Sequence, residues 1–477
     1  MFNSHSLPMG WSTGWPGGFI RPVLSIGIAL MCVLLIPGGA AAQASAAVLL
    51  DKSRQPIPPV PPAPPAPTVT TKPHSPSVQK ALVQAAAELK AARFPFAAVK
   101  VLGDSGDARM AWYLFDLIRF AGSDHQLAIV AAFEKLTGTA LPANPYTAMG
   151  DRLLAWNLPA PPGYREMKRD LYVLIEPRWA PFFADAESII DWRQVGWGGV
   201  YIDDRPDATS GQVCPRGCIP ALDQPKVTPA SDGDWYPSDA IVFGIVVNGQ
   251  ARAYPKHMME IHEMVNDTLG GRQIGIPYCT LCLSVQAYFT DQIPGFTPLL
   301  RTSGLLSRSN KLMYDVRSGS VIDTFTGQAR SGPLRKAGVT LAQTTVVVAT
   351  WGAWRAAHPK TTLLAQDGGI GRNYPLNPLR GRDDQGPIFP VGDVDPRLPV
   401  HEVVLGVTSP QGKALAFPRA AVQLALAAGE PVRLGDVEVR IEAGGLRTFA
   451  GNKEILSQQT FWFAWSQFKP STQLWKR

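Results

Sequence analysis

The chain repeats two of its own motifs, and this repeat constrains its fold more than any other feature. IVFGIVVNGQARAYP (241–255) is echoed by VVLGVTSPQGKALAFP (403–418). TWGAWRAAHPKTTLL (350–364) is echoed by FWFAWSQFKPSTQLW (461–475), so that Trp351 and Trp354 have counterparts 111 positions later. Because self-similarity at a fixed spacing indicates a duplicated structural unit, the sequence predicts two related halves.

The repeated part of the chain has the composition of strands and turns. After residue 197, short runs of β-branched and aromatic residues alternate with Gly, Pro, Asn and Asp, which predicts a mainly β body. We expect its first half over 193–375 and its second over 376–477. The interval between the matched motifs is about twice as long in the first half, and the excess contains two cysteines, a His-Glu pair and an Asn-Asp pair. We therefore expect the functional site there.

Residues 78–192 have a different, helical pattern. VQKALVQAAAELKAARF and DARMAWYLFDLIRFAG carry apolar residues at three- and four-residue spacing. Several short helices in series predict a stack of α-hairpins of HEAT type, used as a scaffold or docking surface. Together with the β body, this region predicts an α+β fold.

The first 77 residues are predicted to lie outside the folded core. Residues 1–47 contain Arg21, then an apolar segment over 23–36, then a cluster of alanines, which is typical of a signal peptide. We therefore expect a periplasmic protein, with an uncleaved membrane anchor as the alternative. Residues 48–77 are rich in proline and predict a stiff, extended linker.

Composition excludes one class of partner and limits the disulfides. The net charge is +7, but Lys and Arg are scattered along the chain, so nucleic-acid binding is not expected. Four cysteines follow the leader, Cys214, Cys218, Cys279 and Cys282, and they allow three connectivities. Cys214 and Cys218 lie in a polar, turn-rich stretch, where a disulfide closing a small loop is expected. A four-thiolate zinc site and a redox relay with the other pair are the alternatives.

The second pair of cysteines follows a stretch that carries acid-base side chains. YPKHMMEIHEMVNDTLGG predicts a helix that ends at its two glycines and places His262 and Glu263 one turn before Asn266 and Asp267. Cys279 follows a dozen residues later, and an imidazole oriented by a carboxylate can activate a thiol.

These residues suggest roles in thiol redox chemistry, of thiol-disulfide or peroxide type. Cys279 is the predicted nucleophile, Cys282 the resolving thiol and His262 the base, with Glu263 or Asp267 orienting the imidazole. A periplasmic thiol or disulfide would then be the partner.

Three other interpretations fit the same residues. The C-x-x-C motif is compatible with a structural disulfide. Cys279 and Cys282 with His257 or His262 are compatible with a copper or zinc site, although the zinc-protease and haem motifs are absent from the sequence. In the third interpretation the chain is a non-catalytic interaction module, with the helices and linker as the binding part and the cysteines as staples. No cofactor is certain.

Five motifs resemble, in order, a bacterial and archaeal family of unknown function, domain-of-unknown-function family 3179. They are ARAYPKHMMEIHEMVNDTLGG, PYCTLC, SGLLSRSNKLMYDVRSGS, GQARSGPL and TWGAWRAAHPKTTLL. The resemblance runs from about Trp197 to the C-terminus and implies no activity. Its H-E-x-x-N-D pattern falls on His262, Glu263, Asn266 and Asp267.

The family's Y-C-P-L-C-G-S motif falls on residues 278–284. Some relatives look like selenoproteins, which implies a reactive chalcogen at this position. Here Thr280 stands in place of the usual proline and Leu283 in place of the usual glycine, so the turn is expected to differ.

Overall fold

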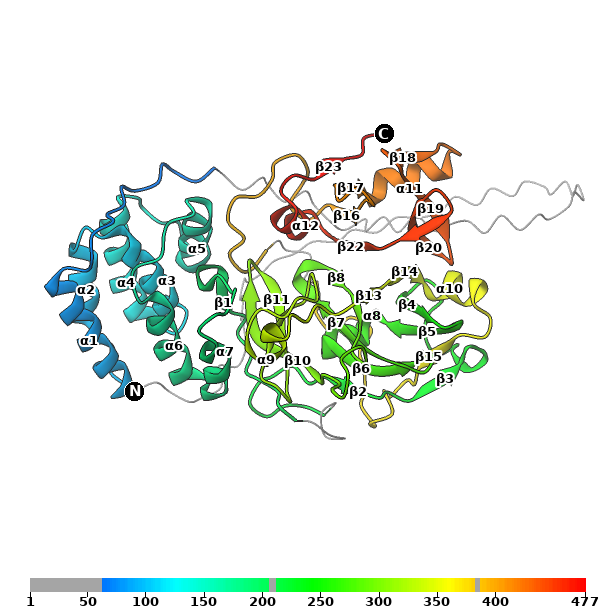
Figure 1. The fold of residues 1–477 in the computed structure, drawn as a ribbon, viewed down its shortest axis with the longest axis horizontal. Helices are drawn as coiled ribbons and strands as arrows, with labels where there is room; N and C mark the ends of the chain where they lie inside the picture. Colours follow the sequence, from blue (N-terminus) through cyan, green and yellow to red (C-terminus); the bar gives the residue numbers. More distant parts are fainter. Residues whose placement is uncertain (1–61, 206–211, 382–386) are drawn as a thin grey trace, which may run out of the picture.

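The fold is α+β, with helices first and a sheet-rich body after them (Figure 1). The structure is a computed structural model that describes residues 62–205, 212–381 and 387–477. The predicted leader and the first part of the proline-rich linker lie outside the described residues. Within the described ranges, no helix combines the length and apolar character needed to span a membrane.

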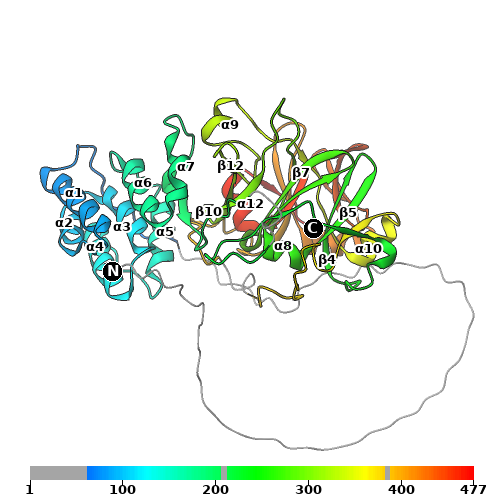
Figure 2. The same cartoon turned by 90° about the horizontal axis from the view of Figure 1, so that it is seen from below.

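The helical region stands at one end of the molecule (Figures 1 and 2). Its helix α1 is capped by the Ser75 hydroxyl, which accepts from the Val78 amide at 3.3 Å, and α4 ends at the left-handed Gly138. The helices are α1 Pro76–Lys90, α2 Phe96–Asp104, α3 Ala111–Ile118, α4 Ser123–Thr137, α5 Pro145–Ala155, α6 Tyr164–Ile175 and α7 Ala180–Ala184.

The helical region shares its hydrophobic core with one sheet of the body. That sheet has the order β1-β10-β11-β12, and Leu305 and Leu312 from it pack in the same buried cluster as the helices. Its strands are β1 Val195–Trp197, β10 Leu300–Ser307, β11 Asn310–Asp315 and β12 Val321–Asp323. A fully buried ion pair, Lys168 Nζ to Asp116 Oδ1 at 2.7 Å, lies at this junction, and Lys168 also donates to the Val195 carbonyl at 2.5 Å.

The described end of the proline-rich segment lies against the helices. The Pro64 carbonyl accepts from the Trp156 indole at 2.6 Å, and the Lys72 carbonyl accepts from Arg109 at 2.7 Å. Residues 62–75 therefore run along the helical region over this part of the linker.

The two repeated segments fold into the same arrangement of strands and helices. In each half a hairpin leads into a helix, a later strand pairs antiparallel with the first strand of the hairpin, and a last strand pairs parallel with the second. In the first half these elements are β4 Ile241–Val247, β5 Gln250–Pro255, α8 Lys256–His262, β14 Val347–Thr350, α10 Trp351–Ala357 and β15 Thr362–Leu364. In the second half they are β16 Val403–Thr408, β17 Ala414–Pro418, α11 Arg419–Ala427, β22 Ser457–Phe461, α12 Trp462–Phe468 and β23 Gln473–Leu474.

The matching tryptophans explain why the motif recurs. A Cβ added to Gly244 would lie 2.3 Å from the Trp354 ring, and one added to Gly406 would lie 2.2 Å from the Trp465 ring. Each indole then donates to a threonine hydroxyl seven residues on, at 3.0 Å in the first half and 2.8 Å in the second. A glycine facing a buried indole is thus the shared packing unit of both halves.

Most strands of a further sheet are inserted between α8 and β14 of the first half. One sheet has the order β13-β9-β7-β6-β2, with β8 beside β7. Its strands are β2 Leu222–Asp223, β6 Met264–Leu269, β7 Arg272–Cys279, β8 Ser284–Val285, β9 Ala287–Phe289 and β13 Gln343–Thr344. Helix α9 Gly332–Lys336 lies between β12 and β13.

The prediction of a helix that runs through Asp267 is wrong. Helix α8 ends at His262, Glu263 takes a left-handed conformation, and β6 begins at Met264. Gly270 and Gly271 form the turn between β6 and β7 instead of ending a helix. Pairing with β7 satisfies the backbone groups of 264–269, and this tertiary partner overrides the helical spacing of the side chains.

The second half inserts a smaller set of strands, which extends the sheet of the first half. They are β18 Val432–Leu434, β19 Val437–Glu442, β20 Gly445–Ala450 and β21 Lys453–Ile455. Strand β20 pairs with β14, so a nine-stranded sheet, edged by β3 Val227–Pro229, runs through both halves. In Figure 1 the second half, in orange and red, lies over the first half, in green.

Candidate thiol site

Cys279 and Cys282 lie at a tight turn between β7 and β8. Cys279 is the last residue of β7, a single 3₁₀ turn covers Thr280–Cys282, and β8 pairs back onto β7. Both cysteines are free thiols, with exposed fractions of 4% and 0%. Their sulfur atoms point at one carbonyl, that of Ser309, at 4.0 Å from Cys279 Sγ and 3.2 Å from Cys282 Sγ.

The Ser309 carbonyl is presented by a strained hairpin turn. Strands β10 and β11 are joined by two residues, Arg308 and Ser309, with φ of 47° and 66°. Two-residue hairpins favour turns with positive φ at both central positions, where Asn-Gly is the usual sequence. Here two residues with side chains occupy that conformation, and the turn places its carbonyl on the thiols.

A buried lysine approaches the thiol turn from the next strand. Lys311 on β11 donates through Nζ to the Tyr278 carbonyl at 2.8 Å and to the Glu263 carbonyl, and its Nζ lies 3.5 Å from Glu263 Oε2. The Thr280 hydroxyl donates to the other oxygen of this carboxylate, Glu263 Oε1, at 2.8 Å.

These neighbours shift the pKa values of the two thiols in opposite directions. Burial and the negative charge of Glu263 oppose ionisation of Cys279, but the hydrogen bond with the Cys282 thiol and the interactions with Lys311 outweigh them and lower the pKa of Cys279. Burial and the adjacent Cys279 sulfur raise the pKa of Cys282 well above its ordinary value. Cys279 is therefore the thiol suited to attack, and Cys282 the one suited to keep its proton.

Backbone strain gathers around the same turn. Glu263, Leu283, Arg308 and Ser309 all have side chains and all take positive φ, between 47° and 66°. Each such residue costs about 1–3 kcal/mol, and residues of this kind cluster at functional sites. Leu283 has a φ of 51°, a conformation that glycine adopts at lower cost than leucine.

The second half forms the cover of the site. The thiols belong to one buried apolar cluster with Val400, Val403, Phe461 and Phe463. The Thr460 hydroxyl also donates to the Cys282 carbonyl at 2.8 Å. In this conformation these side chains of the second half cover both sulfur atoms.

His262 does not serve as the base predicted for Cys279. Its Nδ1 lies 2.7 Å from the Pro220 carbonyl and its Nε2 lies 2.7 Å from the Tyr374 hydroxyl. Because a carbonyl only accepts, Nδ1 carries the proton and Nε2 accepts from the tyrosine. Burial also lowers the pKa of His262 to about 4, so the ring is neutral and both nitrogens are occupied within the fold.

Asn266 and Asp267 lie on strand β6, and their side chains make contacts with neighbouring strands. On strand β6 they point to opposite faces of the sheet, unlike the shared helix face that the spacing suggested. Asn266 exchanges hydrogen bonds with the Leu300 backbone at 3.1 Å in both directions. Asp267 pairs with Arg252 at 2.5 Å and accepts from the Tyr254 hydroxyl at 2.7 Å. Both residues hold strands together.

The residues of the alternative metal site are not gathered around one point. His257 stacks on Tyr236 with ring centroids 5.1 Å apart, and burial lowers its pKa to about 4. Across residues 62–205, 212–381 and 387–477, no group of three or more His, Cys, Asp or Glu side chains could hold a metal ion.

Cys214 and Cys218 are joined by a disulfide, as their spacing predicted. The bond closes a small loop, and Cys218 pairs with Tyr201 in an isolated β-bridge. Within the part of the chain that the structure describes, Cys279 and Cys282 are the two cysteines that remain as thiols.

Sequence reasoning missed Lys311 and Ser309. Both lie inside SGLLSRSNKLMYDVRSGS, a motif of the family resemblance from which no site residue was predicted. The signal available was a lysine in an apolar strand context, two positions after a turn, because a lysine is almost never fully buried unless it is paired.

Comparison with known proteins identifies part of the chain. Residues 216–449 match the profile of a family described as "Protein of unknown function (DUF3179)". The matched range contains the thiol turn, the Lys311 hairpin and most of both related halves. No curated protein and no solved structure matches the chain.

Proposed function

We propose that this chain, whose residues 216–449 belong to the DUF3179 family, carries a dithiol-disulfide redox site at Cys279 and Cys282. In the forward direction the two thiols lose two protons and two electrons to an oxidant of the peroxide or disulfide class, and a Cys279–Cys282 bond forms. A thiol reductant reverses the reaction by exchange.

The observation that carries this proposal is a pair of buried free thiols at a turn where the buried ammonium of Lys311 donates to the Tyr278 carbonyl. A structural cysteine pair needs no charged neighbour, whereas a reactive one needs an electropositive environment. Lys311 supplies this environment, and its pKa is lowered by burial despite Glu263 and the thiols. Lys311 therefore has the role of activating Cys279, which the sequence analysis had assigned to His262.

Each neighbour of the thiols has a defined part in the proposed reaction. Lys311 stabilises negative charge on Cys279, and Glu263 and Thr280 hold the ammonium against the turn. The Ser309 carbonyl accepts from Cys282 at 3.2 Å and keeps that thiol oriented beside Cys279. After Cys279 is oxidised, Cys282 attacks it. A single 3₁₀ turn joins the two residues and already keeps them next to each other.

The predicted leader is consistent with this chemistry. We propose that the protein is exported to the periplasm, where disulfides form and persist. The Cys214–Cys218 disulfide is compatible with such a compartment.

Thiol trapping followed by mass spectrometry tests the proposal. The full chain is reduced, exposed to a graded dithiol-disulfide buffer under native conditions, and alkylated after denaturation. We expect a Cys279–Cys282 bond that forms and opens reversibly. Cys282→Ser should leave Cys279 as a sulfenic acid or mixed disulfide, whereas Cys279→Ser should leave Cys282 reduced.

A matched control uses the other pair of cysteines. The double variant Cys214→Ser with Cys218→Ser should retain the redox change at Cys279. A pair that stays reduced in every oxidant, or that reductants open only after unfolding, would remove the redox function.

A further inference from the structure

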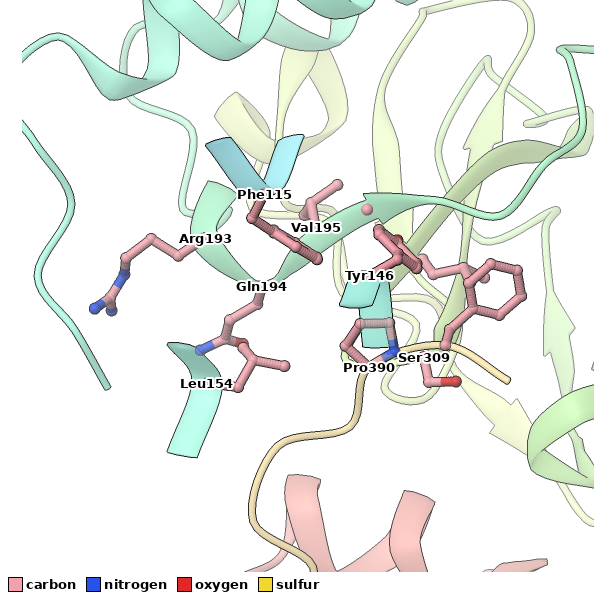
Figure 3. A pocket seen from close by; sticks show the side chains of 11 residues that line it. Phe115, Tyr146, Leu154, Arg193, Gln194, Val195, Ser309 and Pro390 are labelled. Atoms are coloured by element: carbon pink, nitrogen blue, oxygen red, sulfur yellow. The ribbon is translucent and has the colours of Figure 1, made fainter. Parts of the chain in front are cut away.

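A small pocket opens between the helical region and the β body, behind the turn that contacts the thiols. Figure 3 shows Phe115 and Tyr146 reaching it from the helices, with Pro390 and Ser309 closing the opposite side. Leu306 of β10 completes this wall. The cavity has a volume of about 20 Å³, which is room for about one water molecule.

Ser309 belongs to both the pocket and the thiol site. Its side chain lines the pocket, while its carbonyl is the atom that Cys279 Sγ and Cys282 Sγ contact at 4.0 and 3.2 Å. The residue is 3% exposed, and its hydroxyl has no hydrogen-bond partner among the residues that the structure describes. Burying a hydroxyl without a hydrogen-bond partner costs free energy. The Ser309 hydroxyl can therefore bind a small polar molecule.

The segment that carries Pro390, which forms one wall of the pocket, packs closely on helix α5. A Cβ added to Gly150 would lie 2.3 Å from Pro390 Cγ, and one added to Gly392 would lie 2.7 Å from Leu154 Cβ. The segment around Pro390 is thus pressed onto helix α5. Asp151 of the same helix fastens it further by accepting from the Val391 and Gly392 amides at 2.7 and 2.9 Å.

We infer that the oxidant of the thiol site is a hydroperoxide of about the size of water, hydrogen peroxide itself, which approaches through this pocket past Ser309. The inference rests on the proposed redox function. The apolar cover from the second half closes the other side of the thiols, and the pocket admits one small polar molecule and excludes organic hydroperoxides and peptides.

The chemistry balances with hydrogen peroxide as the only co-reactant. The Cys279 thiolate attacks one peroxide oxygen, the O–O bond breaks, and the leaving hydroxide takes a proton to become water. Cys279 is then a sulfenic acid. The Cys282 sulfur attacks it, the S–O bond breaks, and a second water leaves as the disulfide forms. Two thiols and one peroxide thus give one disulfide and two waters.

Competition between oxidants of different size tests the inference. The oxidation rate of Cys279 in the reduced full chain is measured with hydrogen peroxide and with cumene hydroperoxide. We expect hydrogen peroxide to react faster by at least about tenfold. Comparable rates for the two reagents would overturn the pocket as the route.

Pocket variants give the second arm of the test. Leu306→Phe fills the cavity and should lower the hydrogen peroxide rate by about tenfold or more, whereas Leu424→Phe, on an exposed position of α11, should leave it unchanged. If Leu306→Phe fails to fold, Gly196→Ala places a methyl group 3.3 Å from the Tyr146 hydroxyl at the same pocket and should slow oxidation too. An unchanged rate in the folded variant argues against the route.

Removing the serine hydroxyl isolates its contribution. Ser309→Gly suits the φ of 66° and keeps the backbone carbonyl, so the thiol contacts persist. Loss of one hydrogen bond to the peroxide should slow oxidation roughly two- to tenfold. The equilibrium of the pair with a dithiol-disulfide buffer should not move.

The two proposals fail in different ways. If the thiols of the wild-type chain exchange with the dithiol-disulfide buffer but hydrogen peroxide leaves them reduced, the redox function stands and the peroxide inference falls. If neither reagent changes the thiols, the redox function itself falls.

Discussion

The two related halves of the body share a frame but differ in what they insert into it. Both place a buried indole against a glycine, Trp354 on Gly244 and Trp465 on Gly406. The first half inserts the strands that carry the thiols and Lys311, whereas the second inserts β18–β21 and extends its partner's sheet. The frame therefore supplies the fold, the first insertion supplies the chemistry, and the second half contributes the cover.

The largest expected effect tests whether the frame is truly equivalent in both halves. Trp354 and Trp465 have exposed fractions of 0% and 2%. Trp354→Ala and Trp465→Ala should each lower the free energy of unfolding by about 3–5 kcal/mol, because each leaves a cavity beside its glycine. Urea denaturation measures both.

Leu424→Ala, at a position 46% exposed on α11, should change stability by no more than about 0.5 kcal/mol. A large loss in one tryptophan variant and a small loss in the other would show that the halves do not share the same packing unit.

The next effect tests the difference between the halves at the thiols. Lys311→Met removes the buried ammonium that pairs with the Glu263 carboxylate and donates to the Glu263 and Tyr278 carbonyls. We expect a loss of about 3 kcal/mol in the free energy of unfolding and a rise in the pKa of Cys279. Ultraviolet absorbance of the thiolate during a pH titration measures the pKa.

Lys413→Met, in the exposed β16–β17 hairpin of the second half, is the matched control. It should alter neither quantity. A Cys279 pKa that does not move in Lys311→Met contradicts the role of the ammonium.

A smaller effect concerns the connection between the halves, which is fastened to the helical region at Asp151. Burial raises the pKa of this carboxyl to about 6. Because the folded state binds the proton more tightly than the unfolded state, this group's contribution to stability is full below about pH 4 and is lost as pH rises through 6.

Asp151→Asn keeps an oxygen that can accept both backbone amides but does not titrate. The difference in unfolding free energy between the two proteins should therefore change by about 1–2 kcal/mol between pH 4 and pH 7, with the variant gaining relative to the wild type as pH rises. Urea denaturation at a series of pH values measures it, and parallel curves would exclude the raised pKa.

The smallest effect concerns Leu283, which has a φ of 51° directly after Cys282. Leu283→Gly relieves the strain but loses the packing of a half-buried side chain, so stability should change by less than about 1 kcal/mol. Leu283→Val should cost at least about 1 kcal/mol more, because a β-branched residue tolerates positive φ poorly. Thermal denaturation separates the two, and equal stability would show that the turn is not strained there.

Part of this molecule could be predicted from the sequence because the signals are local or repeated. The α+β order follows from periodicity, and the disulfide between Cys214 and Cys218 follows from a short loop. The pair Cys279 and Cys282 was expected at the site, and Glu263 does lie beside it. The strand at 264–269 was not predicted, because its apolar spacing also fits a helix and only the pairing with β7 decides between the two.

The sequence by itself determined the duplicated frame, since a glycine facing a tryptophan is needed wherever the motif occurs. Only the tertiary structure decided which charged group meets the thiols. His262 precedes Cys279 in the chain but is held by Pro220 and Tyr374, while Lys311 arrives from a strand that is 32 positions later than Cys279. The physical reason is that strand pairing and the burial of charge are settled by contacts between distant segments, which local spacing does not encode.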